Sequence, residues 1–397
     1  MKTIIIITLI AVSVSVNATS SDFKDFIHEQ NTGYISDEAE FESEKKNIDK
    51  AFMLYRNKLL NEYKIFRHKA EKIWGVNNTP VSDDKSWVSY EDKLTTRKKI
   101  DFEKGDVRIE VIGTGSVVKE KLKKAIIAVA SINDDISGKH LSEKNRDVTK
   151  PGILTGQLLT KSGEIVSSRN VNEFASDIVN RPLKIKQLKG SDGKTRKVSQ
   201  VKFNLLPEHI KIRAKKYLSP VDKFANKYRI SRNLLFSVIE TESYFNPLAR
   251  SFVPAFGLMQ LVPHYGAREA YRFIYNKDAI LSDTYLYNAN NNIMLGSAYL
   301  HVMFFKHMAN IKDKNSRMWC SIAAYNTGPT NVYRAMIGKY SRSRFRRYSD
   351  WKHKAIKKIN SMTSEDLYKH LRKNLPYKET RNYLLKVRHR MAKYSSL

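Results

Sequence analysis

The alternation of apolar and polar residues divides the 397-residue chain into four stretches. Residues 1–18 begin with an early lysine, continue as an apolar run and end in small residues, which is typical of a signal peptide. Residues 19–70 form a polar lead-in and then a long amphipathic helix, which we expect to begin at Ser36. Its apolar residues recur at steps of three and four and so make one face: Ile48, Phe52, Tyr55, Leu59, Tyr63 and Phe66. We expect this face to pack against the next domain, with a partner-binding helix as the alternative.

Residues 71–206 combine the two-residue period of strands with the longer period of helices, which predicts an α+β domain. Apolar residues alternate from Val107 to Val111 as in a half-buried strand, and residues 116–131 are rich in Ile, Val and Ala as in a helix. Two strand-like runs flank residues 189–194, whose glycines and charges predict a hairpin with a mobile tip. The domain has neither a glycine-rich phosphate loop nor a His/Cys cluster with metal-ligand spacing, so we expect no catalytic chemistry in it.

Residues 207–397 have a helical pattern throughout, with stretches separated by Pro, Asn and Gly. This pattern predicts an all-helical second domain whose boundary lies near residues 205–208. The only cysteine of the chain, Cys320, sits in an apolar run of this domain. We therefore expect a buried structural thiol and no internal disulfide.

The chain is strongly basic, with 71 Lys and Arg against 40 Asp and Glu and a formal net charge of +31. Residues 341–397 alone hold 17 Lys and Arg against 4 Asp and Glu, a net charge of +13. This excess predicts an anionic partner for the C-terminal surface, either wall polymers or lipid headgroups. Nucleic acid would also match the charge, but the signal peptide predicts export, so we expect no nucleic-acid partner.

The segment from Asn233 to Pro247 holds the most informative carboxylate. Val238 and Ile239 lie on the apolar face of a helix, and Glu242 follows them by four and three residues, so it falls on the same face. Glu240 lies two residues from Val238 and should therefore point to solvent. A carboxylic acid on an apolar face has a raised pKa and can donate a proton near neutral pH. The alternative is a glutamate held in a salt bridge, and helical phase does not decide between the two.

Four motifs follow one another from this helix to the end of the chain: Glu242-Ser243, Gly257-Leu258-Met259-Gln260, Ala324-Tyr325-Asn326-Thr327-Gly328 and Glu379-Thr380-Arg381-Asn382-Tyr383. In this order and at these distances the sequence resembles the goose-lysozyme-like members of the soluble-lytic-transglycosylase family. Upstream segments, among them Ile73-Trp74-Gly75 and Gly156-Gln157, are similar to the N-terminal region of membrane-bound members, so the resemblance covers about residues 66–397. It implies a lysozyme-like catalytic domain behind the α+β domain.

The resemblance implies cleavage of the β-1,4 bond between N-acetylmuramic acid (MurNAc) and N-acetylglucosamine (GlcNAc) of peptidoglycan without water, ending in a 1,6-anhydro ring. Most glycosidases use a pair of carboxylates. In the implied reaction the sugar's own C6 hydroxyl attacks, so one residue can serve first as acid and then as base. That residue is Glu242 by resemblance. Neither a cofactor nor a metal is implied.

The other motif residues are implied to bind substrate or to order the site: Ser243, Met259, Gln260, Tyr325, Asn326, Glu379 and Tyr383. The serine is expected to hydrogen-bond near the catalytic carboxyl or the substrate acetamido group, and the methionine and glutamine to form the floor around the scissile bond. The first tyrosine would hold the carboxyl in its working rotamer, and the asparagine would fix the local backbone. The late glutamate and the second tyrosine would close the opposite wall.

The sequence departs from the family at two places. It has no lipidation cysteine near the signal peptide, so we expect residence in the periplasm, with peripheral association with the outer membrane as the alternative. Thr327 and Pro329 stand where small residues are more usual, so the geometry of that loop is open.

Two other functions stay open. The same fold could act as a hydrolytic muramidase, for which Asp278 and Asp283 lie between the motifs. It could also be a catalytically silent module that binds peptidoglycan without cleaving it.

Overall fold

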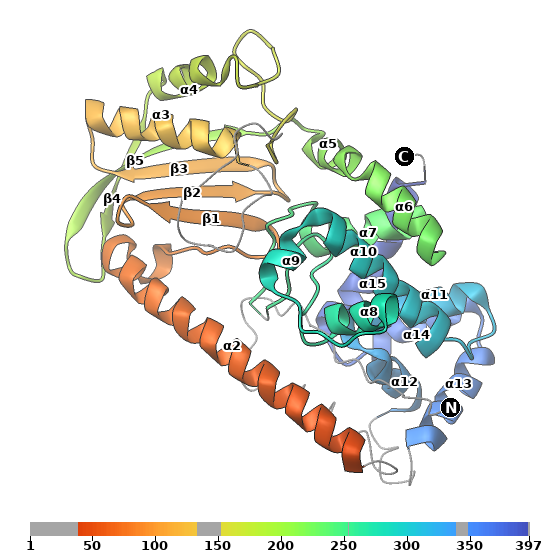
Figure 1. The fold of residues 1–397 in the computed structure, drawn as a ribbon. Coiled ribbons are helices and arrows are strands. Elements are labelled where there is room, and N and C mark those ends of the chain that lie inside the picture. The colour runs from red at the N-terminus through yellow and green to blue at the C-terminus, as the bar shows by residue number, and fades with distance from the viewer. Residues whose placement is uncertain (1–38, 133–151, 253, 339–347, 396–397) are drawn as a thin grey trace.

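The computed structural model describes residues 39–132, 152–252, 254–338 and 348–395. The expected signal peptide, the polar lead-in and Ser36 lie outside these ranges. Within them an antiparallel sheet with helices is followed by a helical domain, as the sequence predicts (Figure 1). None of the helices in the described ranges combines the length and the apolar character needed to cross a membrane.

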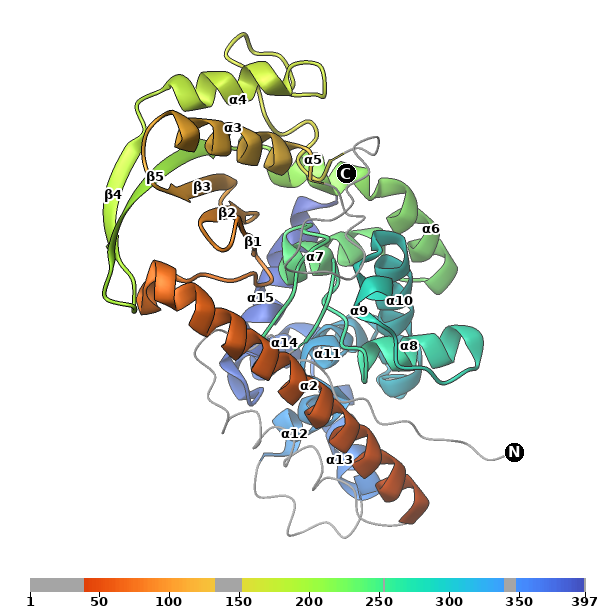
Figure 2. The same ribbon diagram turned by 60° about the vertical axis from the view of Figure 1, so that its left-hand side comes forward.

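The long helix α2 (Ala39–Trp74) runs past both domains (Figures 1 and 2). Its apolar face packs as expected, because the ring of Phe52 lies 4.8 Å from the ring of Tyr265 in the helical domain. At the other end Trp74 is fully buried, and its indole N–H donates to the Leu94 carbonyl at 2.7 Å. The helix ends at Trp74 because the next residue, Gly75, takes a positive φ of 80°.

The five strands form one antiparallel sheet in the order β1-β2-β3-β5-β4. Helices α3 (Ser116–Ala130) and α4 (Val171–Asn180) cover one face, and the end of α2 packs on the other (Figure 1). The strand bounds are Ser86–Glu91 (β1), Thr96–Asp101 (β2), Asp106–Ile112 (β3), Lys184–Lys189 (β4) and Thr195–Asn204 (β5). The strand and the helix expected at residues 107–111 and 116–131 are thus confirmed.

Strand β3 is half-buried, as the sequence predicts: Val107, Ile109 and Val111 are buried, and the opposite face is partly exposed except at Glu110. Its apolar residues pack under α3 and α4, as expected. On the opposite face Glu110 is only 2% exposed. The Arg97 Nε donates to it at 2.7 Å and the Lys186 Nζ at 2.6 Å, so paired charges replace solvent around this carboxylate.

Strands β4 and β5 form the expected hairpin around residues 189–194. Its tip makes hydrogen bonds to α2 and within itself. The Ser191 N–H donates to the Glu71 carbonyl at 3.1 Å, and Arg196 binds Asp192. The tip therefore contacts the last turn of α2, at the Glu71 carbonyl that also accepts the Gly75 N–H at 2.8 Å.

The helical part of the structure begins with α5 at His209. Its central helices α7, α10 and α11 are largely buried, and α15 packs along α7 (Figures 1 and 2). Cys320 on α11 is fully buried, as expected. The helices are α5 (His209–Lys216), α6 (Leu218–Tyr228), α7 (Arg232–Ser243), α8 (Gly266–Tyr275), α9 (Asp283–Tyr287), α10 (Ala289–Val302), α11 (Lys314–Thr327), α12 (Pro329–Ile337), α13 (Tyr348–Asn360), α14 (Ser364–Asn374) and α15 (Lys378–Lys393).

Candidate active site

Helix α7 carries the candidate acid in its last turn. The helix begins at the cap residue Ser231, whose side chain accepts the Leu234 N–H at 3.2 Å. It ends where Tyr244 and Phe245 both take positive φ angles, of 50° and 59°. Two consecutive non-glycine residues in this region are costly, and such conformations cluster at functional sites. The chain reversal leaves Glu242 at the very end of the helix.

Glu242 is buried, with 6% of its surface exposed. Burial, the largest cause, together with the nearby charges of Glu379 and Asp84 raises the pKa of its carboxyl to about 8. The Tyr383 side chain and the Lys386 ammonium oppose this shift. The carboxyl is therefore protonated at neutral pH, as its place on the apolar face predicts.

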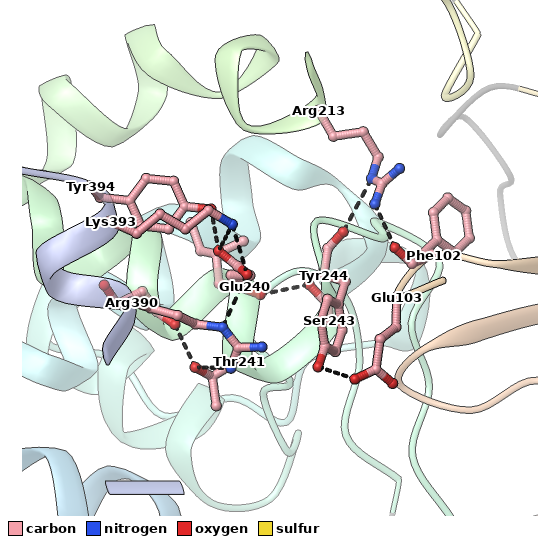
Figure 3. Close-up of polar contacts among 12 residues, drawn as sticks. Phe102, Glu103, Arg213, Glu240, Thr241, Ser243, Tyr244, Arg390, Lys393 and Tyr394 are labelled. Atoms are coloured by element: carbon pink, nitrogen blue, oxygen red, sulfur yellow. Dashed lines mark hydrogen bonds and ion pairs between the residues drawn. The ribbon is translucent and has the colours of Figure 1, made fainter. Parts of the chain in front are cut away.

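Glu240 is buried too, with 4% of its surface exposed, and the expectation that it points to solvent is wrong. Figure 3 shows its carboxylate surrounded by side chains of the C-terminal end of α15 and of Tyr394. The Lys393 Nζ lies 2.9 Å from it and the Arg390 Nε 3.1 Å, and the Tyr394 hydroxyl also donates to it. Burial alone would raise the pKa of Glu240, but these donors hold it below its ordinary value.

Ser243 links the end of α7 to the turn that contains the second motif. Its hydroxyl lies 2.8 Å from the Leu258 carbonyl and 3.0 Å from the Ile239 carbonyl, and the residue is fully buried. The resemblance implies a hydrogen bond near the catalytic carboxyl or to the substrate, whereas this hydroxyl bonds to two backbone carbonyls and so orders the backbone of the site.

The second motif forms a tight turn against α10. Gly257 has a φ of 77°, and a Cβ there would lie 2.5 Å from the Leu286 carbonyl oxygen, so only glycine fits. The Met259 N–H donates to the Asn292 Oδ1 at 2.7 Å. Met259 itself is fully buried against Gly296, so it supports the expected floor from within the core.

Gln260 closes this turn in a strained conformation, with a φ of 46°. Its Nε2 donates to the Gly257 carbonyl at 3.0 Å. Its Oε1 is buried and has no hydrogen-bond partner among the described residues. An acceptor left without a partner in a strained turn is suited to bind a polar group of a ligand.

The third motif ends α11 beside the same turn. The Tyr325 hydroxyl donates to the Met259 carbonyl at 2.8 Å, and so fixes the turn and not the Glu242 carboxyl. The Asn326 Oδ1 is buried without a hydrogen-bond partner in the described part of the chain. The local backbone is held by Asn331, whose Nδ2 donates to the Thr327 carbonyl at 3.0 Å.

Helix α15 supplies the opposite side of the site. Glu379 lies in its first turn, and Tyr383 and Lys386 follow on the same face at helical spacing. Tyr383 is 4% exposed, and its buried hydroxyl makes no hydrogen bond of standard geometry within the described ranges. Its side chain acts on Glu242 by lowering the pKa of that carboxyl, and burial together with the Glu242 charge raises the pKa of the phenol. Helical spacing from Tyr383 could have found Lys386, whereas no pattern in the sequence indicates Asp84, which belongs to the other domain. Across the described ranges, no group of His, Cys, Asp or Glu is placed to hold a metal ion.

Family models and known proteins match most of the chain. The N-terminal domain of membrane-bound lytic murein transglycosylase C matches residues 48–216, and the transglycosylase SLT domain matches residues 219–347. A membrane-bound lytic murein transglycosylase C of Mannheimia succiniciproducens is 33% identical over 343 residues, which cover 86% of this chain and 90% of that protein. The chain belongs to the membrane-bound lytic murein transglycosylase C family.

A relative of the same name from Klebsiella pneumoniae is 33% identical over 325 residues, 81% of this chain and 85% of that protein. The lytic transglycosylase Slt of Pseudomonas aeruginosa, solved as an inactive variant, has a TM-score of 0.33 and 25% identity over 44% of this chain and 23% of that chain. The match to the SLT domain stops at residue 347, so α15, which carries Tyr383, lies beyond it in this member of the transglycosylase C family.

Proposed function

We propose that this protein is a peptidoglycan lytic transglycosylase that cleaves the MurNAc–GlcNAc β-1,4 bond without water, in turnover or remodelling of the cell wall. Membership of the transglycosylase C family supports the reaction. The observation that carries the assignment of the acid is the buried Glu242 carboxyl, whose pKa is raised to about 8. A group that keeps its proton at neutral pH and lies beside strained turns is suited to general acid catalysis.

Glu242 acts twice in the proposed reaction. It first gives its proton to the glycosidic oxygen, so that the GlcNAc side leaves as an alcohol and the substrate's acetamido oxygen stabilises the anomeric carbon. The carboxylate then takes the proton of the C6 hydroxyl as that oxygen bonds to the anomeric carbon, which restores the acid. Tyr383 stabilises the carboxylate between the two steps, because its side chain interacts with Glu242 and lowers the pKa.

The unpaired acceptors at Gln260 and Asn326 are suited to bind hydroxyl or amide N–H groups of the sugars. Ser243, Met259 and Tyr325 keep the floor in place through the contacts described above. Glu379, one helical turn before Tyr383, extends this side of the site toward substrate.

A hydrolytic reaction would require a second carboxylate that activates water. The two candidates between the motifs are occupied elsewhere. Asp278 accepts the Arg268 Nε at 2.6 Å, and the Asp283 Oδ1 accepts the Thr284 N–H at 2.7 Å at the start of α9. Neither belongs to the charges that act on Glu242, which favours the lyase reaction.

Residues 1–18 direct export in this proposal, and the enzyme works in the periplasm. Its basic C-terminal residues hold it against anionic wall polymers or lipid headgroups, including those of the outer membrane.

The products of digestion test the reaction. The mature protein is incubated with isolated sacculi, and the soluble fragments are weighed by mass spectrometry. Anhydro-muropeptides are expected, whereas fragments with free reducing ends would indicate hydrolysis. Binding to sacculi with no release would instead indicate a silent module. Glu242→Gln should lose turnover and keep binding, while Glu173→Gln, an exposed glutamate on α4, should behave as the wild type.

A further inference from the structure

The N-terminal domain is fastened to the backbone that follows Glu242. Arg213 of α5 is only 1% exposed and joins three segments (Figure 3). Its Nε donates to the Tyr244 carbonyl at 3.1 Å, two residues after Glu242, and a terminal nitrogen donates to the Phe102 carbonyl at 2.7 Å. Its other terminal nitrogen donates to the Gln157 Oε1 at 2.6 Å. One buried guanidinium therefore fixes the sheet domain relative to the end of α7.

A second set of contacts brings the loop before β1 onto the helical domain. The Tyr244 hydroxyl donates to Glu103, which also binds the Lys85 Nζ at 2.8 Å (Figure 3 shows the Tyr244–Glu103 pair). The Lys85 ammonium lies 5.5 Å from the centre of the Tyr244 ring. The Arg250 N–H donates to the Asp83 carbonyl at 3.3 Å. The residues on both sides of Asp84 thus contact the segment that follows Glu242.

The loop itself leaves one carboxylate without a direct ionic partner. The Asp83 Oδ1 accepts the N–H groups of Lys85 and Ser86, at 2.9 and 2.6 Å, so this side chain builds the turn. Asp84 makes no ion pair within the described ranges; the charges of Asp83, Lys85 and Lys386 act on it, and its own charge acts on Glu242. Burial and the adjacent Asp83 raise the pKa of Asp84 to about 6.

We propose that Asp84 is a positioning residue of the active site: the N-terminal domain places its carboxylate beside Glu242, where its negative charge keeps the acid protonated. This inference rests on the proposed function. The Lys386 ammonium on α15 acts in the opposite sense, so the two domains set the proton affinity of the acid together.

The remaining charges around Glu242 come from all the elements packed on it. The loop before β1 and the turn after β2 contribute Lys85 and Glu103, α11 contributes the neutral Tyr325, and α15 contributes Glu379, Tyr383, Lys386 and Arg390. Lys85, Glu103 and Arg390 are held by the contacts already described. Asp84 is ionised above a pH of about 6, which is below the pH at which Glu242 loses its proton. The negative charge of Asp84 is therefore present over the pH range in which Glu242 titrates.

The pH dependence of cleavage tests this inference. Initial rates of the full-length mature enzyme are measured on limiting amounts of sacculi from about pH 5 to about pH 10, which reports the pKa of the acid in the free enzyme. Asp84→Asn should move the alkaline limb to lower pH by about one unit, which is about a ten-fold loss of rate on that limb. Lys386→Gln should move the limb to higher pH. Asp84→Glu should restore the wild-type position.

Glu173→Gln is the matched control, since it removes an exposed carboxylate of the same domain on α4 and should leave the profile unchanged. Melting temperatures show whether each variant is folded. An alkaline limb that stays at the wild-type pH in Asp84→Asn would overturn the inference, whatever Lys386→Gln does and even if rates fall at all pH values. The proposed function is judged separately, from the anhydro products of the wild type and the inactivity of Glu242→Gln.

Discussion

Two glutamates two residues apart on α7 lie in opposite surroundings. Glu240 meets a lysine, an arginine and a tyrosine hydroxyl, which hold its pKa below the ordinary value. Glu242 meets apolar surface and other carboxylates, and its pKa rises to about 8. Similar burial therefore yields one structural anion and one acid, which is the division that acid catalysis requires.

The raised pKa of Glu242 predicts a pH-dependent stability cost. In the unfolded chain the carboxyl titrates near its ordinary value of 4.5, and in the folded protein near 8. Between these values the folded state binds more protons, so this group lowers stability as the pH rises. Glu242→Gln should therefore melt above the wild type at pH 8, and the difference should shrink toward pH 4. Calorimetry across this range checks the sign, and an equal melting temperature at all pH values would contradict the buried acid.

Glu240→Gln should separate stability from chemistry. The change leaves Lys393 and Arg390 without their carboxylate partner, which should cost about 1–3 kcal/mol of unfolding free energy because the site is only partly screened by solvent. Denaturant unfolding measures this loss. Turnover at the optimum pH should remain close to that of the wild type. A loss of turnover as large as that of Glu242→Gln would assign the acid to the wrong residue.

Helical phase predicts the burial of Glu242 but fails for Glu240, and the reason is physical. A two-residue step predicts a solvent face only when the helix has one. Helix α7 is buried almost all round. Its largely apolar run from Leu234 to Ile239 indicates a helix without a solvent face, which helical phase alone does not reveal. The ion cluster itself could not be predicted, because Arg390 and Lys393 come from a helix about 150 residues later.

At the scale of elements, the turn at Gly257 ties α7, α10 and α11 together. Gly257→Ala would force a positive φ on alanine and also press its Cβ against the Leu286 carbonyl. Gly163→Ala is the matched control, because its φ is 86° and no atom lies within 4 Å of the added Cβ.

Both variants should lose about 1–2 kcal/mol from the backbone strain alone. Only Gly257→Ala should lose more than this, and only it should slow sacculus cleavage, since the turn positions Gln260 and Met259. Unfolding free energies and release rates measure the two effects. Equal losses in the two variants would show that the close approach to the Leu286 carbonyl is unimportant.

The sequence predicts best those elements whose formation depends on residues close together in the chain. The strand at residues 107–111, the helix from Ser116 and the hairpin around residues 189–194 depend on neighbouring residues, and all are confirmed. The contact of the hairpin tip with Glu71 depends on distant residues and could not be predicted. The role of Gln157 is seen only in the structure, where its side chain accepts a hydrogen bond from Arg213, the residue that joins the domains.

At the scale of the whole molecule, the net charge of +31 predicts salt-dependent adhesion. Binding to sacculi should weaken as salt rises beyond physiological strength, where the Debye length falls below about 8 Å. Exposed lysines of α13 and α14 should contribute most, so the double variant Lys357→Gln/Lys369→Gln should show a shallower salt dependence. The double variant Lys119→Gln/Lys124→Gln on α3 removes the same charge from the other domain.

Co-sedimentation with sacculi over a salt series measures these slopes. Identical slopes for the two double variants would mean that the total charge matters and not its place, and a flat wild-type curve would remove the electrostatic explanation.

The packing of α2 against the helical domain also has a consequence for the order in which the chain folds. The Tyr265 hydroxyl donates to the Asp49 carboxylate at 3.2 Å, although the two residues are 216 positions apart in the sequence. The first half of α2 is thus synthesised early, but the surface that buries it exists only after the middle of the helical domain has formed. Contacts of such long range form slowly, since a large loop must close before they are gained. Helix α2 is therefore synthesised early but is among the last elements to pack.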